Sequence, residues 1–162
     1  MTPPTQMKRR ALLLFVLNRP GVLNKISMLI RRKMYNVETL TTCQTIRPGI
    51  HRMTLTLRED SDAKIAQVIK QMEKLTEVIS AKELDTETSF WREVAIVKAE
   101  ADPSLLEQLG MRYNFEILDR QNHAQVILQV AGPTKTIDDF LDDLGKDKVI
   151  EAARSGFTAL EK

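Results

Sequence analysis

The segment Asn18–Gly21 (Asn-Arg-Pro-Gly) has the residue types expected of a small-molecule site. It follows an apolar run, Arg10–Leu17, and precedes a stretch with helical spacing. A turn that opens a helix offers unpaired N–H groups and the positive end of the helix dipole, which attract a carboxylate. Gly21 permits close backbone approach, and the amide of Asn18 both donates and accepts hydrogen bonds. Asn36 begins the neighbouring strand and is expected to reach the same spot. The segment therefore fits a free amino acid, and it fits equally well a tight turn that caps a helix.

Residue types that support enzymatic chemistry are sparse. The histidines, His51 and His123, both begin predicted strands and lack metal-ligand spacing. The single cysteine, Cys43, lies in a predicted strand, where we expect a small core residue rather than a nucleophile. An enzyme would need an acid–base set around one of the histidines, and residue order alone leaves a triad open. The acids of one predicted helix fit a solvated face better than a metal site; they are Asp138, Asp139, Asp142 and Asp143.

The pattern of apolar residues in the first half predicts the element order β-α-β-β-α-β. The predicted strands are Arg10–Leu17, Asn36–Thr45, His51–Leu57 and Thr76–Leu84. Arg47-Pro48-Gly49 marks a turn between the middle two strands. The third strand alternates, so we expect one set inward (Met53, Leu55, Leu57) and the other outward (Thr54, Thr56). Two amphipathic helices fill the gaps, the first after Pro20-Gly21 and the second after the capping residues Asp60-Ser61-Asp62.

The second half repeats this order after a polar linker, Asp85–Ser89. Its predicted strands are Trp91–Ala99, Phe115–Leu118, Ala124–Val130 and Lys148–Ala153, and its helices open at Asp102-Pro103 and Gly132-Pro133. We therefore predict an α+β protein of two tandem βαββαβ ferredoxin-like domains, at residues 10–85 and 90–162. Because the first strand is apolar on both faces, we also expect a homodimer.

Composition narrows the class of protein. The 162 residues have a net charge of +2, which does not indicate a nucleic-acid partner. Two basic clusters, Lys8-Arg9-Arg10 and Arg31-Arg32-Lys33, fit a strand start and a helix C-terminus, where cations suit the dipole. No apolar run reaches the roughly 20 residues that span a bilayer, and no signal-peptide core follows the N-terminus. We therefore expect a cytoplasmic protein with no membrane contact, and the single cysteine excludes an internal disulfide.

Several segments in order resemble one family. They are Leu17–Ile26, Arg32–Thr41, His51–Thr54, Lys70–Leu75, Arg92–Lys98 and Ala152–Gly156. Together they resemble the small regulatory subunit of acetolactate synthase (acetohydroxyacid synthase), across nearly the whole chain. The resemblance implies that the first domain is an ACT domain, a regulatory module that pairs side by side in a homodimer. It also implies that valine binds at the interface between the two ACT domains.

The resemblance also implies the roles of particular residues and partners. The valine site would involve Asn18, Gly21, Val22 and Leu23 from one chain, and Asn36 with strand residues near Thr41 and Cys43. The partner would be the separate large catalytic subunit, which carries thiamine diphosphate, Mg²⁺ and FAD. The small subunit would raise the activity of that partner and confer feedback inhibition, with no catalysis or cofactor of its own.

Two methionines depart from the family pattern. Met28 and Met34 stand where many family members have glycine. We expect Met28 to fill space where helices approach, and Met34 to require another way of ending the helix and to add bulk near the pocket. The alternative to a regulatory subunit is a stand-alone ACT-type amino-acid-sensing protein that acts on another enzyme or regulator. That reading leaves the matches at Arg92–Lys98 and Ala152–Gly156 unexplained.

Overall fold

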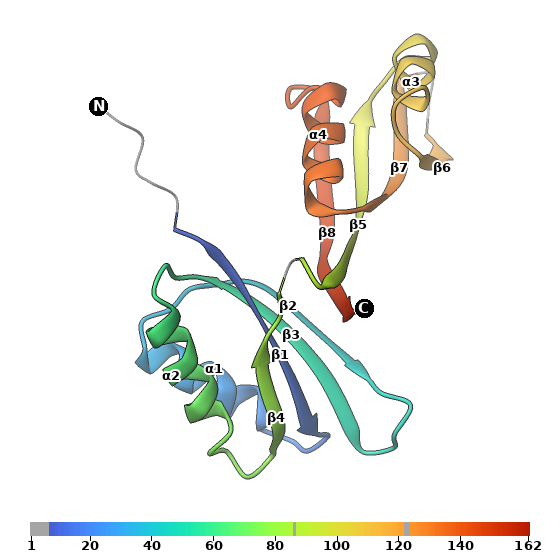
Figure 1. The fold of residues 1–162 in the computed structure, drawn as a ribbon. Coiled ribbons are helices and arrows are strands. Elements are labelled where there is room, and N and C mark those ends of the chain that lie inside the picture. The colour runs from blue at the N-terminus through green and yellow to red at the C-terminus, as the bar shows by residue number, and fades with distance from the viewer. Residues whose placement is uncertain (1–6, 86, 122–123) are drawn as a thin grey trace, which may run out of the picture. The chain divides into compact units, whose positions relative to one another are not determined.

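The computed structural model describes residues 7–85, 87–121 and 124–162, and divides them into two compact units. The first unit runs to Ser89 and includes Glu161 and Lys162; the second is Phe90–Leu160. The elements of the first half are β1 (Arg9–Leu17), α1 (Val22–Arg32), β2 (Val37–Gln44), β3 (Ile50–Arg58), α2 (Asp62–Met72) and β4 (Val78–Glu83) (Figure 1). Those of the second are β5 (Ser89–Glu100), α3 (Pro103–Gly110), β6 (Phe115–Arg120), β7 (Gln125–Gly132), α4 (Thr134–Leu144) and β8 (Val149–Glu161).

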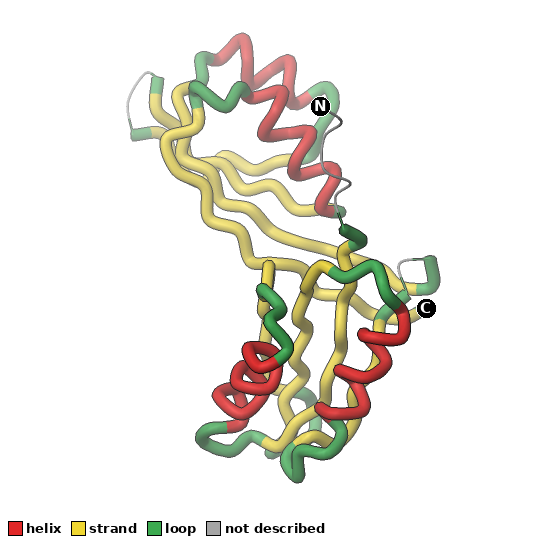
Figure 2. Tube along the Cα trace, turned by 90° about the vertical axis from the view of Figure 1, so that its left-hand side faces the viewer, coloured by secondary structure: helices red, strands yellow, loops and turns green. Residues whose placement is uncertain are grey.

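Each unit is a four-stranded sheet with two helices against one face (Figure 2). The strand order is β2-β3-β1-β4 in the first sheet and β6-β7-β5-β8 in the second. The pairs β1–β3, β1–β4, β2–β3, β5–β7 and β6–β7 are antiparallel. In the first unit, Leu12, Leu14 and Val16 of β1 pack with α1 and α2. In the second, Phe140 of α4 is a fully buried centre of the core. The predicted α+β class with two tandem ferredoxin-like domains is confirmed.

Local capping explains where the helices begin. The Ser61 side chain accepts a hydrogen bond from the backbone N–H of Lys64, at the start of α2. Asp102 caps α3 in the same way through the N–H of Leu105 at 2.8 Å, with Pro103 at the first helical position. Helix α1 is different, because its N-cap is Gly21, which has no side chain to accept a bond. The first turn of α1 is thus left uncapped by the chain itself.

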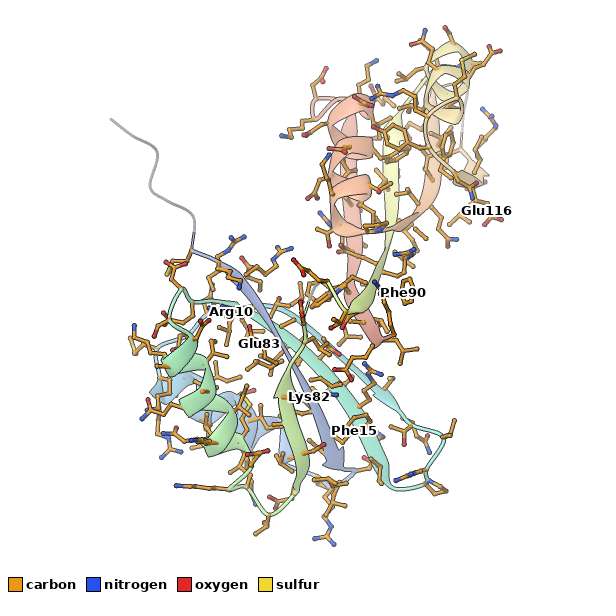
Figure 3. All side chains as sticks on the ribbon, viewed as in Figure 1. Arg10, Phe15, Lys82, Glu83, Phe90 and Glu116 are labelled. Atoms are coloured by element: carbon orange, nitrogen blue, oxygen red, sulfur yellow. The ribbon has the colours of Figure 1, made fainter. Side chains whose placement is uncertain are left out.

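A buried arginine joins the start of β1 to three other segments (Figure 3). The Arg10 guanidinium donates to the carbonyl oxygens of Glu59 and Asp60 at 2.9 and 3.0 Å. It also donates to the carboxylates of Glu83, at 2.9 Å, and Asp62, at 2.5 Å. Burial lowers the pKa of Arg10, but its hydrogen bonds to these carboxylates and their negative charge outweigh burial, so the pKa is raised. The cation therefore stays charged and holds β1, β4 and the start of α2 together.

We expect the first unit to lose stability in acid. Hydrogen bonds from Arg10 hold the pKa of Asp62 below its ordinary 3.8. Burial raises the pKa of Glu38, but hydrogen bonds from Arg58 and Arg9 bring it below its ordinary 4.5. A carboxyl whose pKa is lowered on folding stabilises the fold above its unfolded pKa and ceases to do so as pH falls through the folded value.

The melting temperature of the first unit should thus be flat near neutral pH and fall below about pH 4.5. Circular dichroism of the full chain across this range, with hydrogen exchange to follow the β1 amides, measures it. Asp62→Asn should have a lower melting temperature at neutral pH, and its melting temperature should fall less steeply in acid than that of the wild type. Glu116→Gln, on the exposed strand β6, should follow the wild type at every pH. If the melting temperature of Asp62→Asn falls in acid as steeply as that of the wild type, Asp62 does not contribute to the acid sensitivity.

One expectation about packing is confirmed and two are wrong. Thr54 and Thr56 of β3 face away from the core, as predicted, and both are nevertheless buried; the Thr56 hydroxyl lies 2.7 Å from that of Thr39 on β2. Cys43 is exposed rather than part of the core, because β2 is an edge strand. Met28 is exposed and fills no space between helices, since it lies on the opposite side of α1 from the buried face.

The last strand is longer than expected. Strand β8 continues to Glu161, well beyond the predicted end at Ala153. Gly156 takes a left-handed backbone, with φ at 67°, and the strand resumes with Phe157 and Ala159 buried. A left-handed glycine inside a strand is typical of a bulge, which bends a strand without ending it.

Helix α1 ends in a Schellman motif with methionine at the position that favours glycine. Met34 has φ at 60° and donates its N–H to the Arg31 carbonyl at 2.9 Å. The N–H of Tyr35 donates to the Ile30 carbonyl at 3.3 Å, which completes the motif. The sequence predicted that Met34 would require another way of ending the helix, and this is wrong. Met34 adopts the strained left-handed conformation itself.

Met34→Gly should therefore stabilise the first unit by about 1 kcal/mol, since a left-handed residue with a Cβ costs roughly 1–2 kcal/mol, and the freer unfolded chain offsets part of that gain. Urea unfolding followed by circular dichroism measures the change. Lys33→Gly is the matched control, because Lys33 has φ at −88° and gains nothing from glycine. Equal effects of the two substitutions would show that backbone strain at Met34 is not the cause.

A bidentate ion pair joins β5 to β8 in the second unit. The Arg154 guanidinium donates to both carboxylate oxygens of Glu93, at 2.8 and 2.7 Å, and to Asp138 of α4 at 2.6 Å. Glu93 is only 4% exposed, and the hydrogen bonds that its carboxylate accepts from Arg154 are the largest cause of the raised pKa of Arg154. Glu93 and Arg154 come from the two segments of the second half that carry the family resemblance. The structure gives both segments a structural role.

Candidate functional site

The turn between β1 and α1 leaves its backbone open to solvent. Gly21 takes a left-handed conformation, with φ at 86° and ψ at −7°, and a Cβ placed on it would meet no heavy atom within 4 Å. Asn18 is exposed, and within the described residues its side-chain amide has no hydrogen-bond partner. The turn therefore has a glycine with free space above it and an unused amide beside it.

The first turn of α1 also has unsatisfied N–H groups. Among the described residues, the N–H groups of Leu23 and Asn24 have no backbone acceptor outside the helix, and Gly21 provides no side-chain cap. No acidic side chain lies in this turn. A carboxylate from outside the chain would satisfy these donors and the helix dipole. Leu23 is 45% exposed, whereas the Val22 side chain is buried in the core and offers only backbone.

Asn36 does not reach the Asn18 turn within one chain. Pairing places Leu17 of β1 opposite Ile50, and Gln44 opposite His51, at one end of the sheet. Val37, next to Asn36, pairs with Leu57 at the other end. Nine residues of β1 separate the two ends, or about 25 Å at roughly 3.3 Å per residue. The expectation that one chain brings both asparagines together is wrong, because α1 returns antiparallel to β1 before β2 begins.

A hollow of about 710 Å³ lies at the Asn36 end of the first unit. Its walls include Asn36, Met34 and Lys33, together with Glu38 and Glu59. The hollow thus offers an amide, an apolar side chain and charges of both signs, which are the groups that a zwitterion needs. Glu59 is buried and holds its position by accepting hydrogen bonds from the Tyr35 hydroxyl and the Ser61 N–H; this polar wall had no signal in the sequence.

The remaining candidate residues lie elsewhere. Thr41 and Cys43 of β2 pair with Thr54 and Arg52, on the sheet face opposite the helices. His51 is half-buried in β3, and His123 lies outside the described residues. The acids of α4 each pair with a basic side chain; the pairs are Asp138–Arg154, Asp139–Lys135, Asp142–Lys146 and Asp143–Arg112.

The Asn18 turn is bonded to a hairpin that sequence reasoning treated only as a turn. The N–H of Asn18 donates to the Gly49 carbonyl at 2.8 Å. On the other side of this β2–β3 hairpin, a mostly apolar hollow of about 390 Å³ is lined by Phe15, Ile46 and Ile79, among others. The signal in the sequence was an isoleucine, Ile46, directly before the Arg47-Pro48-Gly49 turn.

In residues 7–85, 87–121 and 124–162, no three histidine, cysteine, aspartate or glutamate side chains are grouped so that they could hold a metal ion. No helix in this part of the chain combines the length and the apolar character that crossing a bilayer requires.

Two family models match the chain, one in each half. Residues 12–80 match the ACT domain of the acetohydroxyacid synthase (AHAS) small-subunit type. Residues 92–162 match the small subunit of acetolactate synthase. The first match covers the candidate turn and the hairpin, and the second covers the segments that contain Glu93 and Arg154.

Full-length relatives agree with both models. A probable acetolactate synthase small subunit of Methanothermobacter thermautotrophicus is 33% identical, over 90% of this chain and 88% of the relative. One from Archaeoglobus fulgidus is 32% identical, over 94% and 96%. The crystal structure of the acetolactate synthase small subunit from Thermotoga maritima superposes with a TM-score of 0.87 at 27% identity, over 96% of this chain and 98% of the other.

Proposed function

The chain belongs to the family of acetolactate synthase small subunits, and from this premise we propose that it is a regulatory subunit without catalysis of its own. It binds a separate catalytic large subunit in the cytoplasm, raises the activity of that subunit, and mediates feedback inhibition by valine in branched-chain amino-acid biosynthesis. Thiamine diphosphate, Mg²⁺ and FAD belong to the large subunit. The observation that carries the proposal is the match of both halves of the chain to this one family.

The effector site in this proposal is built from two chains. Strand β2 is an edge strand with one free side. If two copies pair their β2 strands about a two-fold axis, the strands run antiparallel. The Val37 end of one copy then lies beside the Gln44 end of the other, which is the end where the Asn18 turn lies. A homodimer through the ACT domains thus puts Asn36 of one chain next to Asn18 of its partner.

The chemistry of the two ends is complementary. The Asn18–Gly21 turn offers the N–H groups of Leu23 and Asn24, which suit the carboxylate of an amino acid. The Asn36 end offers amide and carboxylate oxygens, which suit its ammonium group, with the apolar Met34 nearby. Thr41 and Cys43 lie on the same edge strand, between the two ends. A two-fold dimer of this kind contains two equivalent sites.

Reconstitution tests the proposal. The full chain is purified alone and with the acetolactate synthase large chain of the same genome, and acetolactate formation is measured with and without valine. We expect a complex, faster turnover than with the large chain alone, and inhibition by valine. If no complex forms and turnover does not rise, the proposed function is wrong. Calorimetry with valine, leucine and isoleucine then identifies the effector, and a homodimer by light scattering is a requirement of the two-chain site.

A further inference from the structure

The tip of the β2–β3 hairpin exposes a large apolar side chain, that of Ile46. Ile46 is fully exposed, and Ile79 of β4 is 52% exposed. Both line the hollow of about 390 Å³, as does Phe15 of β1, which Figure 3 labels. Phe15 points away from the helices, because its neighbours Leu14 and Val16 pack into the core. We call Phe15, Ile46, Arg47, Ile50 and Ile79 the tip surface.

The charge around the tip surface is positive and largely uncompensated. Within the described part of the chain, no ion pair involves Arg47 of the tip or Arg19 of the adjoining turn. At the other end of the sheet the arginines are satisfied, since Arg9 pairs with Glu38 at 2.6 Å. Unpaired guanidinium groups beside an apolar hollow are typical of protein interfaces, where arginine is enriched at energetically important positions.

The tip is held in one conformation by its own hydrogen bonds. The Thr45 hydroxyl donates to the Ile50 carbonyl at 3.0 Å and accepts from the Arg47 N–H at 3.1 Å. The bond from Asn18 to the Gly49 carbonyl ties the same loop to β1. A preformed loop loses little conformational entropy when a partner binds it.

We propose that the tip surface is where the catalytic large subunit docks. An apolar side chain of that subunit enters the hollow beside Ile46, and carboxylates flanking it face Arg47 and Arg19. This inference rests on the proposed function for the existence of the large subunit. The unpaired guanidinium groups of Arg47 and Arg19 are the reason to expect acidic side chains on the segment that docks. The surface lies on the sheet face opposite the helices and so leaves the outer side of β2 free for the second copy of this chain.

The position of the tip surface also links docking to the effector. Because the Asn18 N–H donates to the Gly49 carbonyl, an amino acid bound at the Asn18 turn would lie one backbone hydrogen bond away from the loop that presents Ile46. If valine changes the affinity of the small subunit for the large subunit, then by linkage the large subunit changes the affinity for valine by the same factor. Valine should therefore bind the complex and the free small subunit with different affinities.

Ile46→Asp tests the tip surface. The side chain is fully exposed, so the variant should fold, melt and dimerise as the wild type does. Its affinity for the large subunit, measured by biolayer interferometry, should fall at least about tenfold, as for a central interface residue. Arg47→Ala should reduce the loss of affinity that the wild type shows between low and high salt. Met111→Asp is the matched control, because Met111 is 78% exposed on the second unit and should bind normally.

The outcomes separate this inference from the proposed function. Wild-type affinity in Ile46→Asp, in a protein that otherwise forms the complex, would overturn the tip surface and leave the function intact. Loss of the homodimer in Ile46→Asp would show that the hairpin pairs two small subunits instead, and would also overturn it. Equal losses in Ile46→Asp and Met111→Asp would show a nonspecific effect of charge. If the wild type binds no large chain, both proposals fail.

Discussion

We expect Gly21→Asp to abolish inhibition by valine in the reconstituted enzyme while the complex still forms and turns over. Gly21 caps α1 with open space above it, so an aspartate there would project toward the N–H groups that we assign to the valine carboxylate. Two like charges about 4 Å apart near a protein surface repel by roughly 4 kcal/mol. Since about 1.4 kcal/mol is a tenfold change in affinity, valine binding should weaken by at least about a hundredfold.

Gly21→Asn is the matched control for this prediction. Gly21 has φ at 86°, a conformation that strains most side chains but that asparagine and aspartate tolerate better than others. Both variants therefore have a similar backbone cost and nearly the same shape, and only aspartate adds the negative charge. We expect the asparagine variant to keep most of the valine inhibition, with calorimetry as a second readout. Inhibition that survives in Gly21→Asp would place the effector elsewhere on the chain.

The largest effect on stability should come from Arg154→Met. This change leaves the buried carboxylate of Glu93 without its bidentate partner. An uncompensated buried charge costs about 3–5 kcal/mol, which is a large part of the stability of a small domain. Urea unfolding followed by the fluorescence of Trp91 measures the loss. Trp91 is the only tryptophan in the chain and stacks edge-on against Phe157 of β8, with ring centroids 4.7 Å apart, so it reports on the second unit.

Two further variants identify the cause of that loss. Asp138→Asn removes the more exposed partner of Arg154, which is 52% exposed, and should cost at most about 1 kcal/mol. The double change Glu93→Gln with Arg154→Met should recover much of the stability, because no buried charge is then left unpaired. If the double variant is no more stable than Arg154→Met alone, the loss arises from packing of the arginine and not from the charge of Glu93.

The order and type of the elements could be predicted from the sequence because they depend on local signals. Apolar alternation, helical spacing and the caps Ser61 and Asp102 act within a few residues of each other. Boundaries were less accurate. The last strand was predicted to end at Ala153, whereas β8 passes through Gly156, whose backbone is left-handed, and continues to Glu161.

The candidate turn was visible in the sequence for the same local reason. Asn18 and Gly21 lie three residues apart, at the junction of a strand and a helix, and the backbone of that junction alone determines its free N–H groups. Family membership also came from the sequence, since ordered segments along the chain carry it. The Glu93–Arg154 pair could not be read in this way, because sixty-one positions separate its members and only strand pairing brings them together.

Tertiary structure alone decided which of these residues meet. The sequence placed Asn36 near Asn18 by position on neighbouring elements, but α1 returns the chain to the opposite end of the sheet, so the two asparagines lie apart in one chain. In the same way, side chains that look alike along a strand differ in exposure: Cys43 is exposed because β2 is an edge, and Ile46 is exposed because the hairpin turns beyond the sheet. The sequence by itself thus determined the family, the elements and a turn suited to a carboxylate. The direction of each strand and its place in the sheet, which are set by pairing between distant segments, decided what that turn faces.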